Sequence, residues 1–224
     1  MRVMIAGAHG KIGSRLGRLL VQRGDEVVGI IRDEDHQLDL IAIGVTPVVM
    51  DLERSTVDQV ADVVADSDAL VFVAGAGPGS GKDRKDTVDR GASVLLAEAG
   101  ERAGVRRFVQ ISSMGVDSVR DGATPPGQDE VFVAYLRAKL AAEDDLRARD
   151  LDWTIMRPGR LTDDPGGGQV RLAPHAEFAP VSRDDVAAVI MALLDSPATT
   201  GLVLEMVAGD TPIGEAIAQL VRRG

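Results

Sequence analysis

The sequence predicts an α/β fold with a doubly wound parallel sheet, because short apolar runs of strand length alternate with longer segments of helical apolar spacing. These runs are continuously apolar, which indicates strands covered by helices on both faces. One α/β domain can fill a chain of 224 residues. We therefore expect a single domain over 1–224, with ligands bound beyond the carboxyl ends of its strands.

Each strand is justified by a run rich in Val, Ile, Leu, Met or Ala that ends at polar or turn-forming residues. In chain order the strands are expected at Val3–Ala6, Glu26–Ile31, Pro47–Met50, Ala69–Ala74, Arg107–Ile111, Trp153–Met156 and Leu202–Val207. Each helix is justified by apolar residues three and four positions apart. The helices are expected at Ile12–Gln22, Val57–Ala65, Thr87–Ala103, Val131–Arg149, Val186–Leu194 and Ile213–Val221.

Helix ends and loops carry their own signals. Gly104 ends one helix, Ser182 caps another, and Thr211-Pro212 opens the last. Segments rich in Gly and Pro are interpreted as loops, at Gly75–Gly81, Gly122–Gly127 and Pro165–Gly168. The first of these lacks two residues of a triphosphate-binding loop and is read as a flexible lip over the site. We expect residues 160–182 to form a small cap or loop insertion on the substrate side.

Charge and composition exclude several classes of function. The formal net charge is −10, which argues against broad nucleic-acid or anionic-membrane binding. The chain has no cysteine, and neither a signal peptide nor a membrane-spanning stretch is apparent, so we expect a cytoplasmic protein. The three histidines lack ligand spacing and Asp163-Asp164 is interpreted as a solvated turn, so no metal site is expected.

Three glycines, Gly7, Gly10 and Gly13, follow the first strand and open the first helix. Such glycines permit a tight turn, let a diphosphate approach the backbone, and allow the helix to pack closely on the strand. The sequence therefore predicts a Rossmann-type site for a nicotinamide dinucleotide, with Lys11 and Ile12 in the same loop. A glycine-rich turn without a ligand is the alternative. His9 either contacts phosphate or faces water.

The end of the second strand bears on the choice of cofactor. Arg32 stands where an acidic residue would hold the ribose hydroxyls of NAD, and a cation there favours the 2′-phosphate of NADP(H). Asp33 follows it and weakens this preference, and Arg32 could also be a solvated strand end. We expect NADP(H), with NAD(H) possible.

A second group of residues suggests proton-transfer chemistry. Ser113 closes the fifth strand, and Tyr135 and Lys139 lie four apart in the following helix, which places them on one helical face. An ammonium beside a phenol lowers the phenol pKa from about 10, so that Tyr can exchange a proton with a carbonyl or alcohol. A serine hydroxyl can orient the same oxygen. The alternative is a surface aromatic and a solvated lysine.

These elements together resemble the short-chain dehydrogenase/reductase superfamily. The turn Arg157-Pro158-Gly159, the segment 180–187 and the ending Asp210-Thr211-Pro212-Ile213 are similar to its atypical, NmrA-like or NAD(P)-binding branch. This branch includes small flavin and biliverdin reductases and epimerase/dehydratase-like proteins. The resemblance covers nearly the whole chain. The loop lacks the Thr often found before the first glycine, and His9 stands where a small residue is common.

The resemblance implies further contacts with the cofactor. Asp51 and Leu52 resemble the adenine-contacting pair, although Asp51 could equally cap a turn. The remaining residues expected at the cofactor are Ala74, Gly75, Ala76, Ile111, Ser112, Lys139, Arg157, Pro158 and Gly159.

The leading hypothesis is an NADP(H)-binding oxidoreductase that reduces a small carbonyl, quinone or flavin-like substrate, with Tyr135 as the proton donor. A non-catalytic NADP(H) sensor that docks a partner protein is the alternative. A sugar epimerase or dehydratase ranks third, because only about 65 residues follow Gly159, which leaves little room for a substrate lobe. We expect a small-molecule substrate and a monomer or small homo-oligomer.

Overall fold

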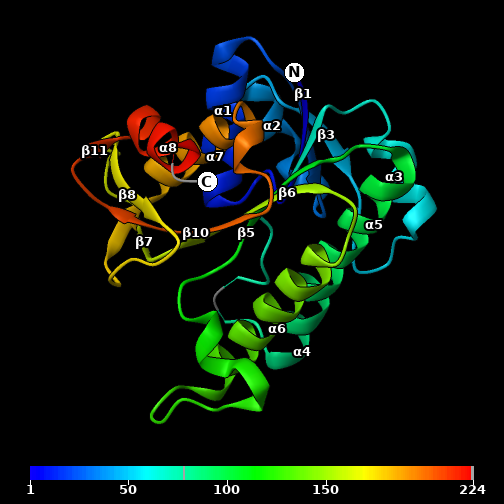
Figure 1. The fold of residues 1–224 in the computed structure, drawn as a ribbon. Helices are drawn as coiled ribbons and strands as arrows, with labels where there is room; N and C mark the ends of the chain where they lie inside the picture. Colours follow the sequence, from blue (N-terminus) through cyan, green and yellow to red (C-terminus); the bar gives the residue numbers. More distant parts are fainter. Residues whose placement is uncertain (78, 223–224) are drawn as a thin grey trace.

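A computed structural model describes residues 1–77 and 79–222, and it contains a large, mostly parallel central sheet between layers of helices (Figure 1). Pro78, which belongs to the expected lip, and the last two residues lie outside the described residues. The expected α/β fold with a doubly wound sheet is confirmed.

Seven parallel strands form the body of the central sheet. They are β1 Arg2–Ala6, β2 Glu26–Ile31, β3 Thr46–Val49, β4 Ala69–Phe72, β5 Arg107–Ile111, β6 Asp152–Pro158 and β10 Leu202–Ala208. Their spatial order is β3-β2-β1-β4-β5-β6-β10. The order reverses between β1 and β4, and open α/β sheets bind their ligands in the crevice at such a switch point.

The helices cover both faces of this sheet. They are α1 Lys11–Arg23, α2 Gln37–Ala42, α3 Val57–Val64, α4 Lys82–Arg84, α5 Ser93–Ala103, α6 Glu130–Arg147, α7 Arg183–Leu194 and α8 Ile213–Val221. α1 packs against α7 in one layer and α3 against α5 in the other (Figure 1). Short turns of 3-10 helix lie at Glu34–His36, Val116–Gly122 and Pro197–Thr199.

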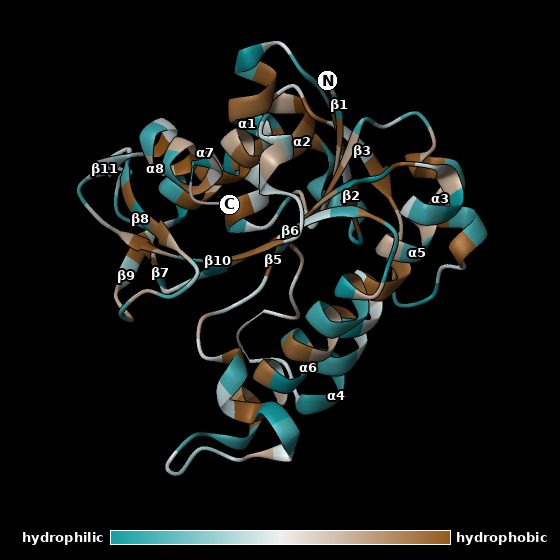
Figure 2. Cartoon of the chain, viewed as in Figure 1, coloured by the Kyte–Doolittle hydropathy of each residue, from teal (hydrophilic) through white to brown (hydrophobic). Residues whose placement is uncertain are grey.

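The central sheet divides the core into two layers, and β1 is buried on both of its faces. Val3 and Ile5 contact the apolar cluster that includes Leu16 of α1, whereas Met4 contacts the cluster on the opposite face. Figure 2 shows hydrophobic residues along β1 and β5, between the helix layers. The continuous apolar runs of the sequence are thus explained by burial on both sides.

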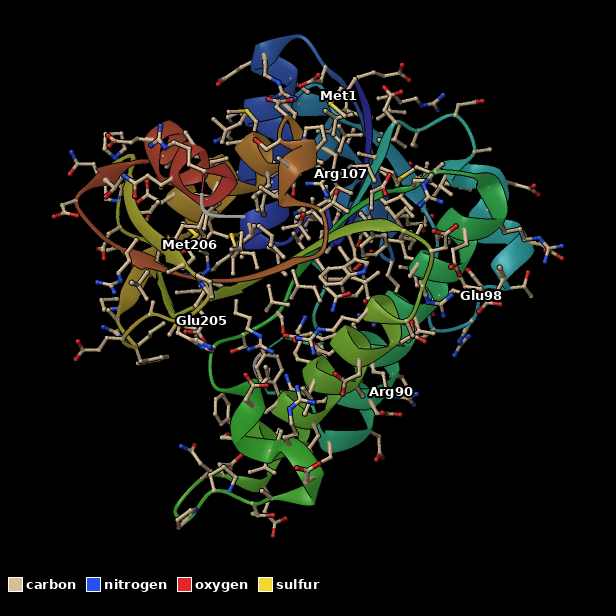
Figure 3. The ribbon with its side chains drawn as sticks, viewed as in Figure 1. Met1, Arg90, Glu98, Arg107, Glu205 and Met206 are labelled. Atoms are coloured by element: carbon tan, nitrogen blue, oxygen red, sulfur yellow. The ribbon has the colours of Figure 1, made fainter. Side chains whose placement is uncertain are left out.

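A partly buried arginine joins the second half of the sheet to its helix layer. Arg107 of β5 lies near the centre of the molecule, and its guanidinium donates to the carbonyls of Asp152 and Leu193 at 2.7 and 2.6 Å (Figure 3). It also donates to the hydroxyl of Thr154 at 2.9 Å. Burial lowers the pKa of Arg107 from its ordinary value, and the charge of Asp152 opposes this shift only in part.

Two segments differ from the expectation. The helix expected at Thr87–Ala103 begins earlier, at Lys82, and passes through a π-helical stretch at Lys85–Ala92 before α5. Residues 160–182 contain three strands, β7 Arg160–Thr162, β8 Gln169–Ala173 and β9 Pro180–Ser182. β8 joins the central sheet antiparallel to β10 and pairs with β11 Thr211–Pro212, while β7 and β9 form a separate pair.

These extra strands change the interpretation of the segment that was expected as a cap. The segment expected as a cap is partly built into the edge of the sheet, and whether it shapes substrate entry stays a prediction. Across the part of the chain that the structure describes, we find no helix with the length and apolarity needed to cross a membrane.

Candidate functional site

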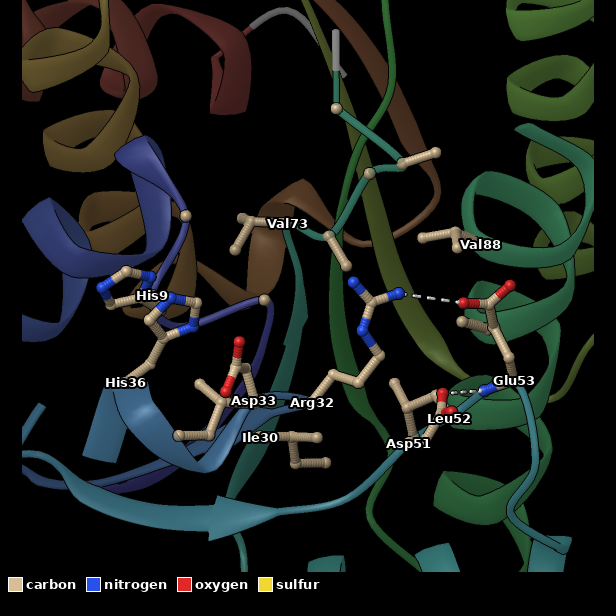
Figure 4. A pocket seen from close by; sticks show the side chains of 18 of the residues that line it. His9, Ile30, Arg32, Asp33, His36, Asp51, Leu52, Glu53, Val73 and Val88 are labelled. Atoms are coloured by element: carbon tan, nitrogen blue, oxygen red, sulfur yellow. Dashed lines mark hydrogen bonds and ion pairs between the residues drawn. The ribbon is translucent and has the colours of Figure 1, made fainter. Parts of the chain in front are cut away.

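A cavity of about 560 Å³ lies at the carboxyl ends of β1, β2, β3 and β4 (Figure 4). It includes the switch point between β1 and β4. The cavity brings together eleven residues that the sequence places at a cofactor, namely Gly7, His9, Gly10, Lys11, Ile12, Arg32, Asp51, Leu52, Ala74, Gly75 and Ala76. Four separate segments of the chain therefore supply these residues and meet where the fold predicts a ligand.

The glycine loop is shaped for close backbone approach. Gly7 has φ of 87°, and a Cβ there would lie 2.7 Å from Cα of Ala74 across the switch point. A Cβ on Gly13 would lie 2.3 Å from the carbonyl oxygen of Gly7. Gly10 is the N-cap of α1, and no side chain in the described chain caps this helix. The first-turn N–H groups of α1 can therefore serve the anionic diphosphate of a dinucleotide, which fits the residues present.

A charged cluster forms the wall of the cavity beside Arg32. The carboxylate of Glu53 accepts from Arg84 at 2.8 Å and from Arg32 at 3.3 Å, and the hydroxyl of Thr87 donates to it at 2.5 Å (Figure 4). The Thr87 hydrogen bond and the two guanidinium groups hold the pKa of Glu53 below its ordinary value. Two arginines thus share one carboxylate on this wall.

The two aspartates near Arg32 are engaged in local turns. Asp33 accepts from the N–H of Asp35 at 3.1 Å and caps the short helix Glu34–His36. Asp51 accepts from the N–H of Glu53 at 3.0 Å, which is the turn-capping role that the sequence left open. Both residues still line the cavity, as does Leu52.

The imidazole of His9, in the glycine loop, contacts two neighbouring side chains. Its ring stacks on the ring of His36 with centroids 3.6 Å apart and an angle of 10° between the planes. Its Nε2 lies 2.9 Å from a carboxylate oxygen of Asp39. Both imidazoles line the cavity, so this pair forms its edge between the glycine loop and the end of β2 (Figure 4).

Lys139 lies deep in the fold, where β4 and β5 end. Its Nζ donates to the carbonyls of Ile111 at 3.1 Å and Ala74 at 3.4 Å, and lies 3.4 Å from the carboxylate of Asp89. Asp89 also accepts from the N–H of Ala76 at 3.2 Å, so it joins Lys139 to the turn that lines the cavity. Sequence spacing gave no signal for Asp89, because its partners lie far away along the chain.

Tyr135 and Ser113 contact residues other than Lys139. The ring of Tyr135 stacks near Phe132 with centroids 5.9 Å apart, and Nζ of Lys85 lies 5.5 Å from its centroid. The hydroxyl of Ser113 donates to the carbonyl of Met114 at 3.1 Å. Among the described contacts, none joins Tyr135 to Lys139 directly. The shared helical face is thus insufficient to bring the phenol and the ammonium together.

Ser112 lies at the same sheet edge. Its N–H donates to the carbonyl of Met156 at 2.8 Å, and its hydroxyl is buried without a hydrogen-bond partner among the described residues. An unpartnered buried hydroxyl is costly and suits a position that contacts a bound molecule.

The Arg157 side chain of the Arg157-Pro158-Gly159 segment is held by ion pairs within the protein. Its guanidinium donates to both carboxylate oxygens of Glu143 at 2.8 and 2.6 Å and to Asp117 at 2.6 Å. This network joins β6 to α6, and the expected contact of this segment with the cofactor stays a prediction. Gly159 packs tightly, since a Cβ there would lie 2.1 Å from the carbonyl oxygen of Ala179.

Several polar residues of the cavity were missed by sequence reasoning. Glu53, Arg84, His36 and Arg183 all line it, yet none belongs to a motif with fixed spacing. Within the described residues, no group of three or more His, Asp or Glu side chains could hold a metal ion.

Known proteins similar to this chain match it over nearly its full length. The model of the NAD(P)H-binding family matches residues 7–197. The uncharacterized sugar epimerase YhfK of Bacillus subtilis is 34% identical over 98% of this chain and 100% of its own. A solved candidate NAD-dependent epimerase/dehydratase from Bacillus halodurans has a TM-score of 0.88 and 34% identity, covering 98% of this chain and 99% of that one. ChuY, an anaerobillin reductase from Escherichia coli O157:H7, has a TM-score of 0.77 and 26% identity, covering 94% of this chain and 98% of its own.

Proposed function

The chain belongs to the NAD(P)H-binding family, and from this premise we propose that it is an NADP(H)-dependent oxidoreductase that reduces a small carbonyl, quinone or flavin-like substrate. The resemblance of the sequence to the NAD(P)-binding branch of short-chain dehydrogenases/reductases is confirmed by this membership. The finer proposal depends chiefly on one observation, the cavity that joins the glycine loop to Arg32 and Arg84.

The preference for NADP(H) is supported by the charge of the cavity wall. Arg32 and Arg84 both contact Glu53, so two guanidinium groups lie together on this wall. A 2′-phosphate carries close to two negative charges and accepts bidentate hydrogen bonds from guanidinium groups. The side chain of Arg32 is 55% exposed, which leaves it free to turn toward such a phosphate. NAD(H) offers no group that would use this charge.

We propose the following roles for the other residues. A bound nicotinamide cofactor would supply the hydride. Lys139, held by the carbonyls of Ile111 and Ala74, would donate to a ribose hydroxyl of the cofactor. Ser113 would orient the substrate oxygen, and Tyr135 would give it a proton. The unpartnered hydroxyl of Ser112 is a further donor at the same edge.

The contacts of Tyr135 support a second candidate function. Since Lys139 is paired with Asp89 rather than with the phenol, a non-catalytic NADP(H) sensor is compatible with the site. A sugar epimerase is less well supported, because β8, β10 and β11 all belong to the central sheet and do not build a separate substrate lobe.

The test is a titration of the purified protein with NADPH and NADH, followed by nicotinamide fluorescence. We expect tighter binding of NADPH, and loss of both cofactors in Gly10→Asp, which places a carboxylate at the N-terminus of α1. NADPH oxidation is then measured with a panel of carbonyls, quinones and flavins. Binding without oxidation of NADPH by any of these compounds would favour the sensor. Failure to bind either nucleotide would contradict both functions.

A further inference from the structure

A carboxylate from the segment after β7 joins two cations that line the cavity. Nζ of Lys11 lies 2.6 Å from one oxygen of Asp163, and a guanidinium nitrogen of Arg183 lies 2.9 Å from the other. Lys11 is the first residue of α1, and Arg183 is the first residue of α7. Asp163 thus holds together the starts of two helices that are far apart in sequence.

The position of this cluster corresponds to the diphosphate end of the cavity. α1 and α7 pack against each other, so that their first turns lie at the same edge of the sheet (Figure 1). Lys11 and Arg183 both line the cavity, as do Gly7 and Gly10 of the glycine loop. Arg32 and Arg84 also line the cavity, and we have assigned them to the 2′-phosphate. Lys11 and Arg183 therefore face a different part of a dinucleotide.

Charge in this cluster is incompletely balanced. Arg15 approaches Asp163 at 3.6 Å, but it is bonded more closely to Asp184, at 2.6 Å. One carboxylate is thus shared by two cavity cations and lies near the positive end of α1. The bonds from Lys11 and Arg183 hold the pKa of Asp163 below its ordinary value, so the carboxylate is ionised near neutral pH. It presents two anionic oxygens, as one phosphate of a diphosphate does.

The loop that carries Asp163 is held in place by hydrogen bonds from the three glycines that follow it. The N–H of Gly166 donates to Asp184 at 3.2 Å, and the N–H groups of Gly167 and Gly168 donate to Asp185 at 3.1 and 2.8 Å. These bonds attach the loop to the start of α7. Asp163 itself is half-exposed, so its side chain can leave the cations without breaking the bonds of the loop.

On the basis of the proposed function, we infer that Lys11 and Arg183 form a clamp for the cofactor diphosphate, and that Asp163 occupies this clamp as an internal anion which the diphosphate displaces. Arg183 is then a cofactor-binding residue and Asp163 lowers the affinity for either nucleotide. Cofactor binding also releases the Asp163 side chain from the clamp, which couples the site to the segment after β7.

The first variant tests the clamp. Arg183→Gln should weaken NADPH and NADH binding alike, by roughly tenfold, because the diphosphate is common to both cofactors. Arg171→Gln is the matched control, since Arg171 is exposed on β8 and forms no ion pair among the described residues. Equal affinity of Arg183→Gln and the wild-type protein for both nucleotides would overturn the inference.

The second variant tests the displacement and distinguishes it from a bracing role. Asp163→Asn should bind both nucleotides several-fold more tightly, because it removes the competing charge and keeps a similar shape. Asp164→Asn is the matched control at the exposed neighbouring position. Unchanged or weaker binding in Asp163→Asn would overturn the inference, because Asp163 would then only position the cations. If the wild-type protein binds neither nucleotide, it is the proposed function that fails. Far-UV circular dichroism and thermal unfolding verify that each variant is folded.

Discussion

The ammonium of Lys139 lies 3.4 Å from the carboxylate of Asp89, with both side chains almost completely buried. A buried charge that loses its partner is strongly destabilising. We therefore expect Asp89→Asn to lower the free energy of unfolding by about 3 kcal/mol, because the ammonium is left among carbonyl groups alone. Urea unfolding at pH 7 measures this change.

The double variant Asp89→Asn/Lys139→Met serves as the control for that experiment. It removes the orphaned charge together with its partner, so part of the lost stability should return. If the two single changes simply add, Asp89 and Lys139 are not coupled, and the contact contributes little to the fold.

A second prediction concerns discrimination between the two nucleotides. Arg32→Gln should weaken NADPH binding by roughly tenfold and leave NADH binding unchanged, because the guanidinium is expected to contact the 2′-phosphate that NADH lacks. Fluorescence titration measures both affinities. Arg54→Gln is the matched control, with a side chain that is 89% exposed and 3.7 Å from Asp51. An equal loss for the two nucleotides would instead place Arg32 at a group they share.

The fold and one wall of the site follow from local sequence patterns. The glycines of the loop after β1 have their positions fixed by turns within a few residues, and the strands of the core are continuous apolar runs. β8 was missed because Gln169 and Arg171 alternate with buried Val170 and Leu172 in a segment beside glycines. An edge strand with one buried face gives a short and weak pattern.

The charged partners of the site could not be predicted, because they depend on contacts between distant residues. Lys11 and Asp163 are 152 positions apart, and no local spacing relates them. Lys139 shows the converse limit. Its spacing from Tyr135 is right for one helical face, but Asp89 and the carbonyls at the ends of β4 and β5 determine where its ammonium lies. Helical periodicity determines the face of the helix on which a side chain lies, whereas residues distant in the sequence determine what that side chain contacts.

A third prediction concerns acid stability. The Thr87 hydrogen bond, followed by Arg84 and Arg32, lowers the pKa of Glu53. A lowered carboxyl pKa stabilises the fold above the pKa of the unfolded chain, and this contribution is lost as the pH falls through the lower folded value. Glu53→Gln should therefore be less stable than the wild-type protein at pH 7, and the difference should shrink as the pH falls below about 4.

The pH dependence of urea unfolding in the two proteins tests this prediction. Glu177→Gln is a suitable control, since Glu177 is exposed and forms no ion pair among the described residues. A difference between Glu53→Gln and the wild-type protein that is constant from pH 7 to pH 3.5 would mean that Glu53 stabilises the fold through packing instead of charge.

The role of Tyr135 gives the last prediction. Tyr135→Phe keeps the ring, so the packing against Phe132 and the approach of Lys85 should persist and the fold should be unchanged. Tyr135 does not line the described cavity, so NADPH affinity should also be unchanged. If the phenol donates the proton, the turnover of a carbonyl substrate should fall by at least about 100-fold.

Phe132→Leu is the control, because it alters the packing of the ring and leaves the hydroxyl in place. Carbonyl turnover that falls in Tyr135→Phe but not in Phe132→Leu identifies the hydroxyl as the active group. Full activity of Tyr135→Phe would remove Tyr135 from the chemistry. The pairing of Lys139 with Asp89 would then be the expected arrangement of a site whose substrate, such as a flavin, takes its proton from water.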